Sequence, residues 1–308
     1  MTTARDVPDR RQILVGVEAV GDSVAAIDWA AREAAARHAP LTLVHTWDWG
    51  SVPLMSAQYG YGEKQAIEQE GGRILARAKE HALAAGAFDV HVVRRRGYAP
   101  DVLLDMTADA ALLVVGSRHA STIARGVFGS VSTAVVSEAM CPVVVLSGPP
   151  GAREARPQVV AGVSCEPHDQ DVLAFAFDYA NRNQLPLRTV FCWQSTFGSL
   201  SLPPPDVAKL RLSETLAGWR AQYSDVETHL VVRRGHPIDI LVASSASQAL
   251  VVVGRHAPHL RFGALLGSTS LGVVHHATCP VAVIPPTVVA REPGLVREAV
   301  GEPAGASS

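Results

Sequence analysis

Cysteine is scarce in this sequence, and long apolar runs are missing altogether. The chain has four cysteines in 308 residues, too few for the disulfide framework of a small secreted protein. None of its apolar runs approaches the roughly 20 residues that span a bilayer. The first residues, MTTARDVPDRR, are polar and lack the apolar core of a secretory signal. We therefore expect a cytoplasmic protein with reduced thiols and no membrane segment.

An excess of charge of either sign is also missing, which argues against a nucleic-acid partner. The formal net charge is −2 and the chain has no strongly basic block. Non-specific binding to nucleic acid needs a concentrated positive patch. The short run Arg94–Arg96, with a reduced echo at Arg233 and Arg234, is interpreted as a solvated strand end.

The residues that are abundant indicate an α/β protein. Hydrophobic residues make up 48% of the chain, charged residues 18% and aromatic residues only 6%. Abundant alanine and valine with few aromatics are typical of α/β units with buried parallel strands. At this length the chain can form two ordinary domains, each with its own core.

The same motif occurs twice, at residue numbers that differ by 138. The first copy starts at Leu112 and reads LLVVGSRHASTIARGVFGSVSTAVVSEAMCPVVVL; the second starts at Leu250 and reads LVVVGRHAPHLRFGALLGSTSLGVVHHATCPVAVI. The matched pairs include Gly116 with Gly254, Gly129-Ser130 with Gly267-Ser268, and Cys141-Pro142 with Cys279-Pro280. Because one register carries every match, the chain is a duplicated unit.

Weaker matches extend the duplication along nearly the whole chain. ILVGVEAV from Ile13 aligns with VVAGVSCE from Val159, and PLTLVHTW from Pro40 aligns with PLRTVFCW from Pro186. The first copy is longer in a predicted surface loop that starts near residue 49. We expect domains at 12–148 and 157–286, joined by a linker at 149–156, with disordered ends at 1–11 and 287–308.

Within each copy, short β-branched runs alternate with longer helical segments. The expected strands are 12–18, 40–47, 88–94, 111–116 and 142–147, and then 157–163, 186–193, 226–233, 249–254 and 280–284; the expected helices of the first copy are 23–38, 62–86, 99–108 and 128–139. This alternation implies parallel strands with right-handed crossovers, so each domain is expected to be a doubly wound α/β sheet. The apolar final strands would be exposed edges. They are expected to pair or pack against each other, which makes the chain an intramolecular pseudo-dimer.

Ligands of an open parallel sheet sit beyond the carboxyl ends of its strands. In each copy the loop after the fourth strand ends in Gly-Ser at a predicted helix start, where free N–H groups and the helix dipole favour an anion. Glycine lets an oxyanion approach the backbone, and serine can cap the helix and offer a hydroxyl. The other interpretation of each Gly-Ser is a simple turn and cap. The loops also carry basic residues: Arg118, His119 and Arg125 in one copy, and Arg255, His256, His259 and Arg261 in the other.

The loop pattern resembles the signature of the universal stress protein family: Gly, two residues, Gly, nine residues, Gly, then Ser or Thr. Both halves resemble that domain from ILVGV and PLTLVH to the closing CPVVVL. The whole chain thus resembles a tandem universal stress protein of the kind common in actinobacteria. The resemblance implies, for each half, a five-stranded parallel sheet in the order 3-2-1-4-5 with helices on both faces.

Members of that family that bind ATP use a first-strand aspartate for adenosine, the glycine loop and Ser/Thr for phosphates, and a second-strand residue against adenine. The resemblance puts the adenine contact at Thr46 and Cys192. The full set of candidate ligand-binding residues is Gly16, Val17, Glu18, Thr46, Gly116, Arg118, His119, Gly129, Ser130, Val131 and Ser132 in the first half, and Gly162, Ser164, Cys192, Gly254, His256, Gly267, Ser268, Thr269 and Ser270 in the second.

Each half departs from the family pattern at two positions. The middle glycine of the loop is His119 in one half and Ala257 in the other, and the strand-one aspartate is Glu18 and Ser164. His119 adds bulk where the backbone should approach phosphate, although a cationic imidazole could pair with that phosphate. Glu18 keeps the carboxylate and Ser164 loses it. Each half therefore keeps part of the site and alters another part.

The remaining reactive residues are assigned structural roles. The two Cys-Pro pairs have no neighbouring base that would activate a thiol. His275 and His276 are adjacent on a predicted helix, so they cannot converge on one metal ion. Trp47, Trp49 and Trp193 follow the second strands, where they either pack under a loop or stack on a base.

No paired carboxylates, base–nucleophile pair or metal cluster converges with the glycine loops, so we expect neither an efficient enzyme nor a metal site. Slow ATP hydrolysis is left open. The predicted function is a cytoplasmic stress-response regulator that binds ATP, with or without Mg, in at least one domain. The alternative is a nucleotide-free scaffold for an unknown protein partner. A homodimer of the tandem chain is left open.

Overall fold

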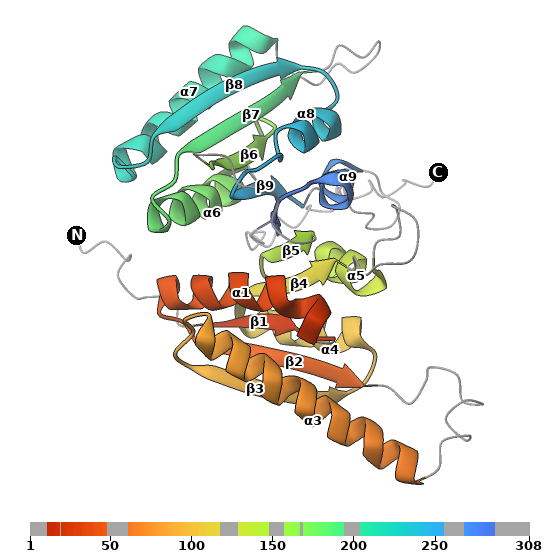
Figure 1. Cartoon of the computed structure of the whole chain (residues 1–308). Helices are drawn as coiled ribbons and strands as arrows, with labels where there is room; N and C mark the ends of the chain where they lie inside the picture. The colour runs from red at the N-terminus through yellow and green to blue at the C-terminus, as the bar shows by residue number, and fades with distance from the viewer. Residues whose placement is uncertain are drawn as a thin grey trace, which may run out of the picture.

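The computed structural model describes residues 11–18, 20–47, 61–117, 129–147, 157–166, 169–193, 204–255 and 268–286. In this part of the chain a single ten-stranded sheet has the order β3-β2-β1-β4-β5-β10-β9-β6-β7-β8 (Figure 1). Its strands are β1 (Gln12–Gly16), β2 (Leu41–Trp47), β3 (Val90–Arg96), β4 (Ala110–Ser117), β5 (Val143–Ser147), β6 (Val159–Val163), β7 (Leu187–Trp193), β8 (Thr228–Arg234), β9 (Leu250–Gly254) and β10 (Val281–Ile284). Each half therefore has the expected order 3-2-1-4-5, and the predicted fold class is confirmed.

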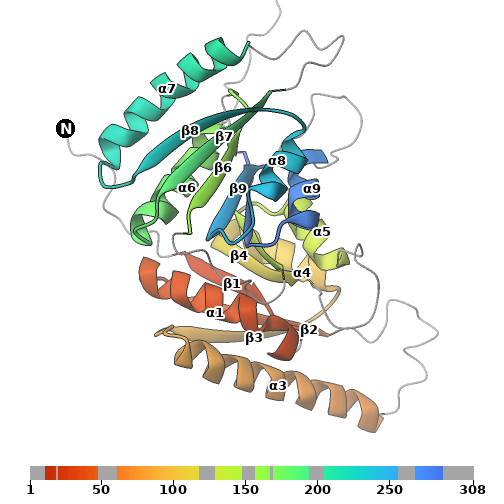
Figure 2. The same cartoon turned by 45° about the horizontal axis from the view of Figure 1, so that its top comes forward.

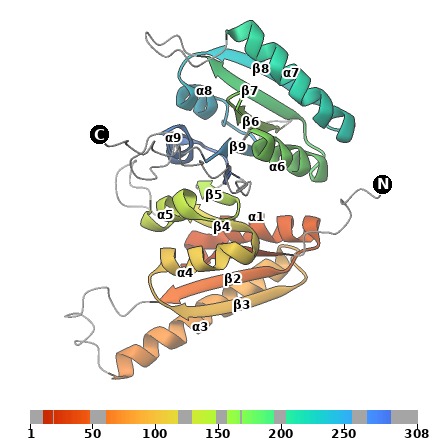
Figure 3. The same ribbon diagram turned by 180° about the vertical axis from the view of Figure 1, so that it is seen from behind.

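Helices connect successive parallel strands and cover both faces of the sheet. They are α1 (Val20–Arg37), α3 (Tyr61–Ala84), α4 (Ala99–Met106), α5 (Ser130–Glu138), α6 (Asp169–Arg182), α7 (Pro205–Gln222), α8 (Pro237–Ala243) and α9 (Ser268–His276), with a short 3-10 turn at Thr107–Asp109. One apolar core lies under α1, α3, α6 and α7, and a second lies under α4, α5, α8 and α9. Figures 2 and 3 show α4, α5, α9 and α8 following one another along the sheet.

The central strands are buried on both faces, which explains their continuous apolar sequences. The side chains of β9 and β10 are all buried, and β4 is buried along nearly its whole length. The edge strand β3 is different, since most of its side chains are exposed. Its last three residues are Arg94–Arg96, which confirms that the arginine run is a solvated strand end. Charged side chains on an edge also discourage pairing with another chain.

The two halves join where β5 pairs with β10 in antiparallel fashion. Val144 lies opposite Ala282 at the centre of this pairing, and both side chains are fully buried. Both apolar cores continue across the junction, because each contains residues of β5 and of β10. The pairing predicted from the two apolar edges is therefore confirmed.

Some predicted boundaries were wrong by about two residues. Strand β3 runs from Val90 to Arg96, where residues 88–94 were expected, and helix α5 starts at Ser130, where residue 128 was expected. The expected linker and nearly all of the two expected disordered ends lie outside the described residues. Among the described residues, none of the helices is both long and apolar enough to cross a membrane.

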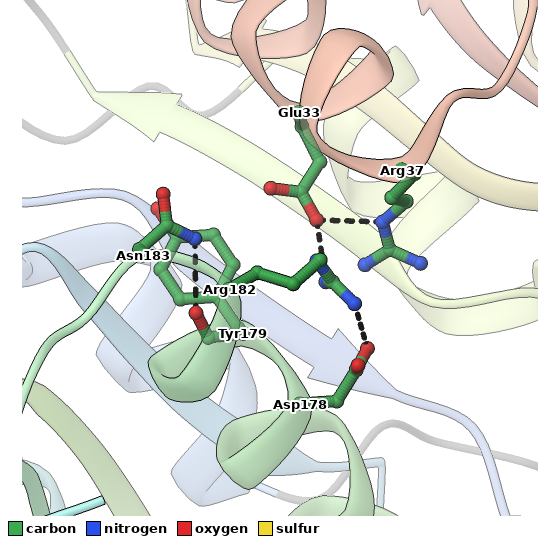
Figure 4. Close-up of polar contacts among 6 residues, drawn as sticks. All are labelled: Glu33, Arg37, Asp178, Tyr179, Arg182 and Asn183. Carbon is green, nitrogen blue, oxygen red and sulfur yellow. Dashed lines mark hydrogen bonds and ion pairs between the residues drawn. The ribbon is translucent and has the colours of Figure 1, made fainter. Parts of the chain in front are cut away.

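A buried ion-pair network joins helix α1 of the first half to helix α6 of the second (Figure 4). The carboxylate of Glu33 is 3% exposed and accepts hydrogen bonds from Arg37 Nε at 2.6 Å and Arg182 Nη2 at 2.8 Å. Arg182 also bonds Asp178 within α6. Burial by itself would lower the pKa of Arg182, but Glu33 and Asp178 outweigh it and raise that pKa.

Aromatic contacts accompany this network. Trp29 stacks on Tyr179 with ring centroids 5.9 Å apart, and Arg37 lies over the ring of Phe175 at 5.7 Å. Trp29 and Phe175 occupy matching positions in the two copies, yet they make different contacts. The helix contact is therefore not symmetric, because each half contributes its own set of side chains.

We predict that Glu33→Gln lowers the free energy of unfolding by about 3 kcal/mol, because it removes the buried carboxylate that two partly buried guanidinium groups share. Urea unfolding followed by circular dichroism measures this. Glu70→Gln is the matched control: it breaks an exposed ion pair with Arg73 (3.2 Å) and should cost about 0.5 kcal/mol or less. Equal losses in the two variants would contradict the assigned role of Glu33.

Candidate functional site

A cavity of about 320 Å³ opens at the carboxyl ends of β1 and β4 in the first half. Its wall is built by three segments that are far apart in sequence. The first is the end of β1 with the neighbouring end of β2, the second is the turn before α4, and the third is the end of β4 with the first turn of α5. The size is in the usual range for small-molecule sites, roughly 300 to 1,000 Å³.

Every described first-half candidate lines this cavity. These residues are Gly16, Val17, Glu18, Thr46, Gly116, Gly129, Ser130, Val131 and Ser132. The other two, Arg118 and His119, lie outside the described residues. Candidate residues from separate parts of the sequence thus line the same cavity.

The end of β1 is held in place by the neighbouring strand and helix. Val17 N–H donates to the carbonyl of Val44 at 2.8 Å, and His45 Nδ1 donates to the carbonyl of Val17 at 2.8 Å. A Cβ at Gly16 would lie 3.3 Å from Leu103 Cδ1, a tight contact. Packing against α4 therefore explains why glycine stands at the end of this strand.

The start of α5 differs from the prediction in one respect. Gly129 is the N-cap residue, with no side-chain cap, so the proposed capping role of Ser130 was wrong: Ser130 is already the first helical residue. Thr133 N–H bonds the carbonyl of Gly129 at 3.1 Å. The amides of the preceding turn therefore point out of the helix end, toward the cavity that these residues line.

Ser132 has a structural role in addition to its place in the cavity wall. Its hydroxyl is almost fully buried and donates to the carbonyl of Gly116 at 3.2 Å. Ser270 makes the same bond to Gly254 in the second half, at 2.6 Å. In both halves this bond ties the helix start to the end of the fourth strand, which fixes the shape of the site.

Sequence reasoning missed part of the cavity wall. Gly97 and Tyr98 form the turn before α4, Ala99 begins that helix, and Ser23 lies in the first turn of α1. Gly97 has φ of +146°, and its counterpart Gly235 has φ of +144°. This left-handed geometry favours glycine, so the repeated glycine was a signal for a turn that brings α4 to the site.

The second half has the same framework with other side chains. Gly162 lies at the end of β6, where an added Cβ would be 3.0 Å from Leu241. Cys192 is half-buried at the end of β7, and Thr269 is in the first turn of α9. His256 and Gly267 lie outside the described residues, as do Arg125, Ala257, His259 and Arg261; Ser268 begins α9.

A carboxylate and a hydroxyl have changed places between the halves. Glu18 and Ser23 of the first half correspond to Ser164 and Asp169 of the second. Glu18 N–H donates to Ser23 Oγ at 3.3 Å. In the second half, Asp169 is buried and accepts bonds from the N–H and hydroxyl of Ser164, at 2.9 and 3.1 Å. The second half therefore has its carboxylate at Asp169 and not at position 164, and that carboxylate caps the loop.

Both described tryptophans of this region stack on arginine. Arg94 lies over the ring of Trp47 at 5.1 Å, and Arg234 lies over Trp193 at 5.4 Å. This supports the packing interpretation of Trp47 and Trp193, while Trp49 lies outside the described residues.

Among the described residues, no group of His, Cys, Asp and Glu side chains could hold a metal ion.

Comparison with known proteins places this framework in a family. The sequence model described as "Universal stress protein family" matches residues 9–147 and again residues 156–285. The chain belongs to the universal stress protein family. The two matches also agree with the tandem architecture inferred from the duplicated motif.

Relatives of similar length share both halves. A universal stress protein of Mycobacterium tuberculosis (strain H37Rv) is 36% identical over 287 residues, covering 88% of this chain and 96% of the relative. A universal stress protein of Mycolicibacterium smegmatis is 33% identical over 290 residues, covering 89% and 97%. A solved universal stress protein structure from Archaeoglobus fulgidus has the same fold, with a TM-score of 0.71 at 16% identity over 90% of this chain and 99% of that one.

The thiols of this universal stress protein are poorly suited to nucleophilic chemistry. Burial raises the pKa of Cys141 and of Cys279 to about 12. Burial also raises the pKa of Cys192 to about 11, and burial together with the charge of Asp169 raises that of Cys165 to about 11. A thiol reacts as its thiolate, so these shifts suppress reactivity near neutral pH.

We predict slow labelling of the folded protein by Ellman's reagent. Well below these pKa values each thiol is almost wholly protonated, so the rate should be about 100-fold below that of an unstructured cysteine and should rise with pH. Denaturant should release fast reaction of all four thiols. A native thiol that reacts at the free-cysteine rate would contradict the account, and Cys192→Ala would show whether that thiol is Cys192.

Proposed function

We propose that this chain is a cytoplasmic stress-response regulator whose first half binds an adenine nucleotide, with ATP as the expected form. The observation that carries the proposal is the cavity itself. It places Glu18 and Thr46 on one wall and the first turn of α5 on another. A ligand with a polar sugar, an aromatic base and an anionic tail would match Glu18, Thr46 and this helix turn, respectively.

The walls differ in the ligand groups that they suit. The outward-facing amides of Ser130–Ser132 and the positive end of the helix dipole favour phosphate oxygens. Glu18 can accept hydrogen bonds from ribose hydroxyls, and Thr46 lies where family members contact adenine. Among the described residues, the nearest neighbour of an added Cβ at Gly129 would be Ser132 Oγ at 3.8 Å, which leaves room for a ligand beside this backbone.

The first half is the better candidate because its loop is capped by a neutral hydroxyl and not by a buried carboxylate. Asp169 accepts three backbone or hydroxyl donors of its own loop, from Ser164 and Glu166. That buried carboxylate stiffens the second-half loop and uses donors that a ligand would otherwise meet. In the first half the corresponding cap is the neutral hydroxyl of Ser23.

Regulation fits the site better than turnover. Glu18 is the one carboxylate among the described residues of the cavity wall, and His45 has Nδ1 bound to a backbone carbonyl. Hydrolysis needs an oriented water and a base within reach of it. We therefore propose that nucleotide occupancy sets the state of the protein, with Mg entering as part of the bound nucleotide.

The rival function is a nucleotide-free scaffold that binds a protein partner through its surface. It requires that the cavity bind no nucleotide, so a direct binding measurement separates the two. Competition with a fluorescent ATP analogue on nucleotide-stripped protein provides that measurement.

We predict that Gly129→Ala weakens ATP binding about tenfold, because a methyl group at the N-cap holds phosphate away from the helix amides. The backbone at Gly129 is extended, with φ of −63°, so alanine is accommodated there and the fold should be kept. Gly218→Ala adds the same methyl on α7, where no atom of the described residues lies within 4 Å, and should leave affinity unchanged. Equal affinities in all three proteins would argue against phosphate binding at this turn.

A further inference from the structure

A second groove, of about 390 Å³, lies on the sheet face over β7 and β8 in the second half. Its lining includes Gln158, Arg188, Val190, His229, Val231 and Arg233. It shares no residue with the first-half cavity. Helix α8 packs beside the groove on the same face, with Leu241 in the apolar core that also contains Val190, and it is only seven residues long.

The groove has an arginine near each end and valines between them. Arg188 pairs with His229 across the two strands, and Arg233 lies four residues beyond His229. The two guanidinium groups are thus attached about 13 Å apart along the strands. Among the described residues, neither guanidinium is ion-paired or hydrogen-bonded and no carboxylate lines the groove. Val190 and Val231 form the floor between them.

One polar atom of the groove lacks a donor. The amide oxygen of Gln158 is buried and has no hydrogen-bond partner among the described residues. A buried acceptor of this kind is costly unless a ligand or water supplies an N–H or O–H. His229 is less available, since its Nε2 contacts Glu227 at 3.0 Å at the exposed end of the strand.

The first half shows the same position without these features. Gln12 and Thr42 correspond to Gln158 and Arg188, and the hydroxyl of Thr42 donates to the amide oxygen of Gln12 at 2.6 Å. The groove there is lined by both Arg11 and Asp109, so it carries charges of both signs. The second copy has thus replaced a self-satisfied polar pair with an arginine and an open acceptor.

We propose that the second-half groove binds an extended acidic segment of a partner protein. Extended chains rise about 3.3 Å per residue and place alternate side chains on one face. Acidic side chains four residues apart would therefore reach both arginines, and the side chain midway would rest on the valine floor. A backbone N–H of the same segment would satisfy Gln158. The proposal concerns a different surface from the nucleotide cavity and does not depend on it.

Fluorescence anisotropy with a short labelled peptide tests this directly. The probe has the order glutamate, threonine, valine, threonine, glutamate, and a matched peptide has glutamine at both ends. We expect the acidic probe to bind the full-length protein, with affinity that falls as salt is raised, and to bind at least about tenfold more tightly than the glutamine peptide.

Arg188→Thr restores the residue found at this position in the first half, so it should fold; it is expected to weaken probe binding at least about tenfold. Arg233→Gln should act similarly, while Arg95→Gln, the equivalent change in the first half, should have no effect. An affinity unchanged in Arg188→Thr, or no binding to the wild-type protein, would overturn the proposal. Displacement of the probe by millimolar inorganic phosphate would show a small-anion site instead and would also overturn it.

Discussion

Pairing between β5 and β10 holds the two halves in one sheet, because each strand would otherwise present an apolar edge to water. The antiparallel contact buries Val144 and Ala282 completely and carries both cores across the junction. It also brings α1 against α6, where the buried carboxylate of Glu33 can bind Arg182. The position of every other element relative to the opposite half depends on this strand pair.

Duplication followed by divergence explains how one chain can carry two kinds of surface. The shared framework is kept by packing and backbone bonds, such as the bond from Ser132 to Gly116 and its copy from Ser270 to Gly254. Side chains outside that framework have changed separately. A capping carboxylate is found at Asp169 in only one half, and a free guanidinium replaces Thr42 in the groove.

Strands buried on both faces were predictable from sequence, because such strands are continuous apolar runs whose pattern is local. The final strand pair was predictable for a related reason: two apolar edges in one chain have few other ways to avoid water. The turn at Gly97 and the exchange of a carboxylate and a hydroxyl between the halves, at Glu18 and Asp169, were not predictable from the sequence. Both depend on contacts between segments that only the folded chain brings together. Ser130 was misassigned as the cap because the helix begins at Ser130 itself, which makes Gly129 the N-cap residue.

Calorimetric titration of Mg-ATP into nucleotide-stripped, full-length protein tests the central claim most directly, since it reports stoichiometry as well as affinity. The account predicts one site per chain, in the half whose loop is capped by the neutral hydroxyl of Ser23. Absence of binding heat over a range of temperatures, with the protein folded, would contradict the nucleotide assignment. Two equal sites per chain would contradict the divergence of the halves.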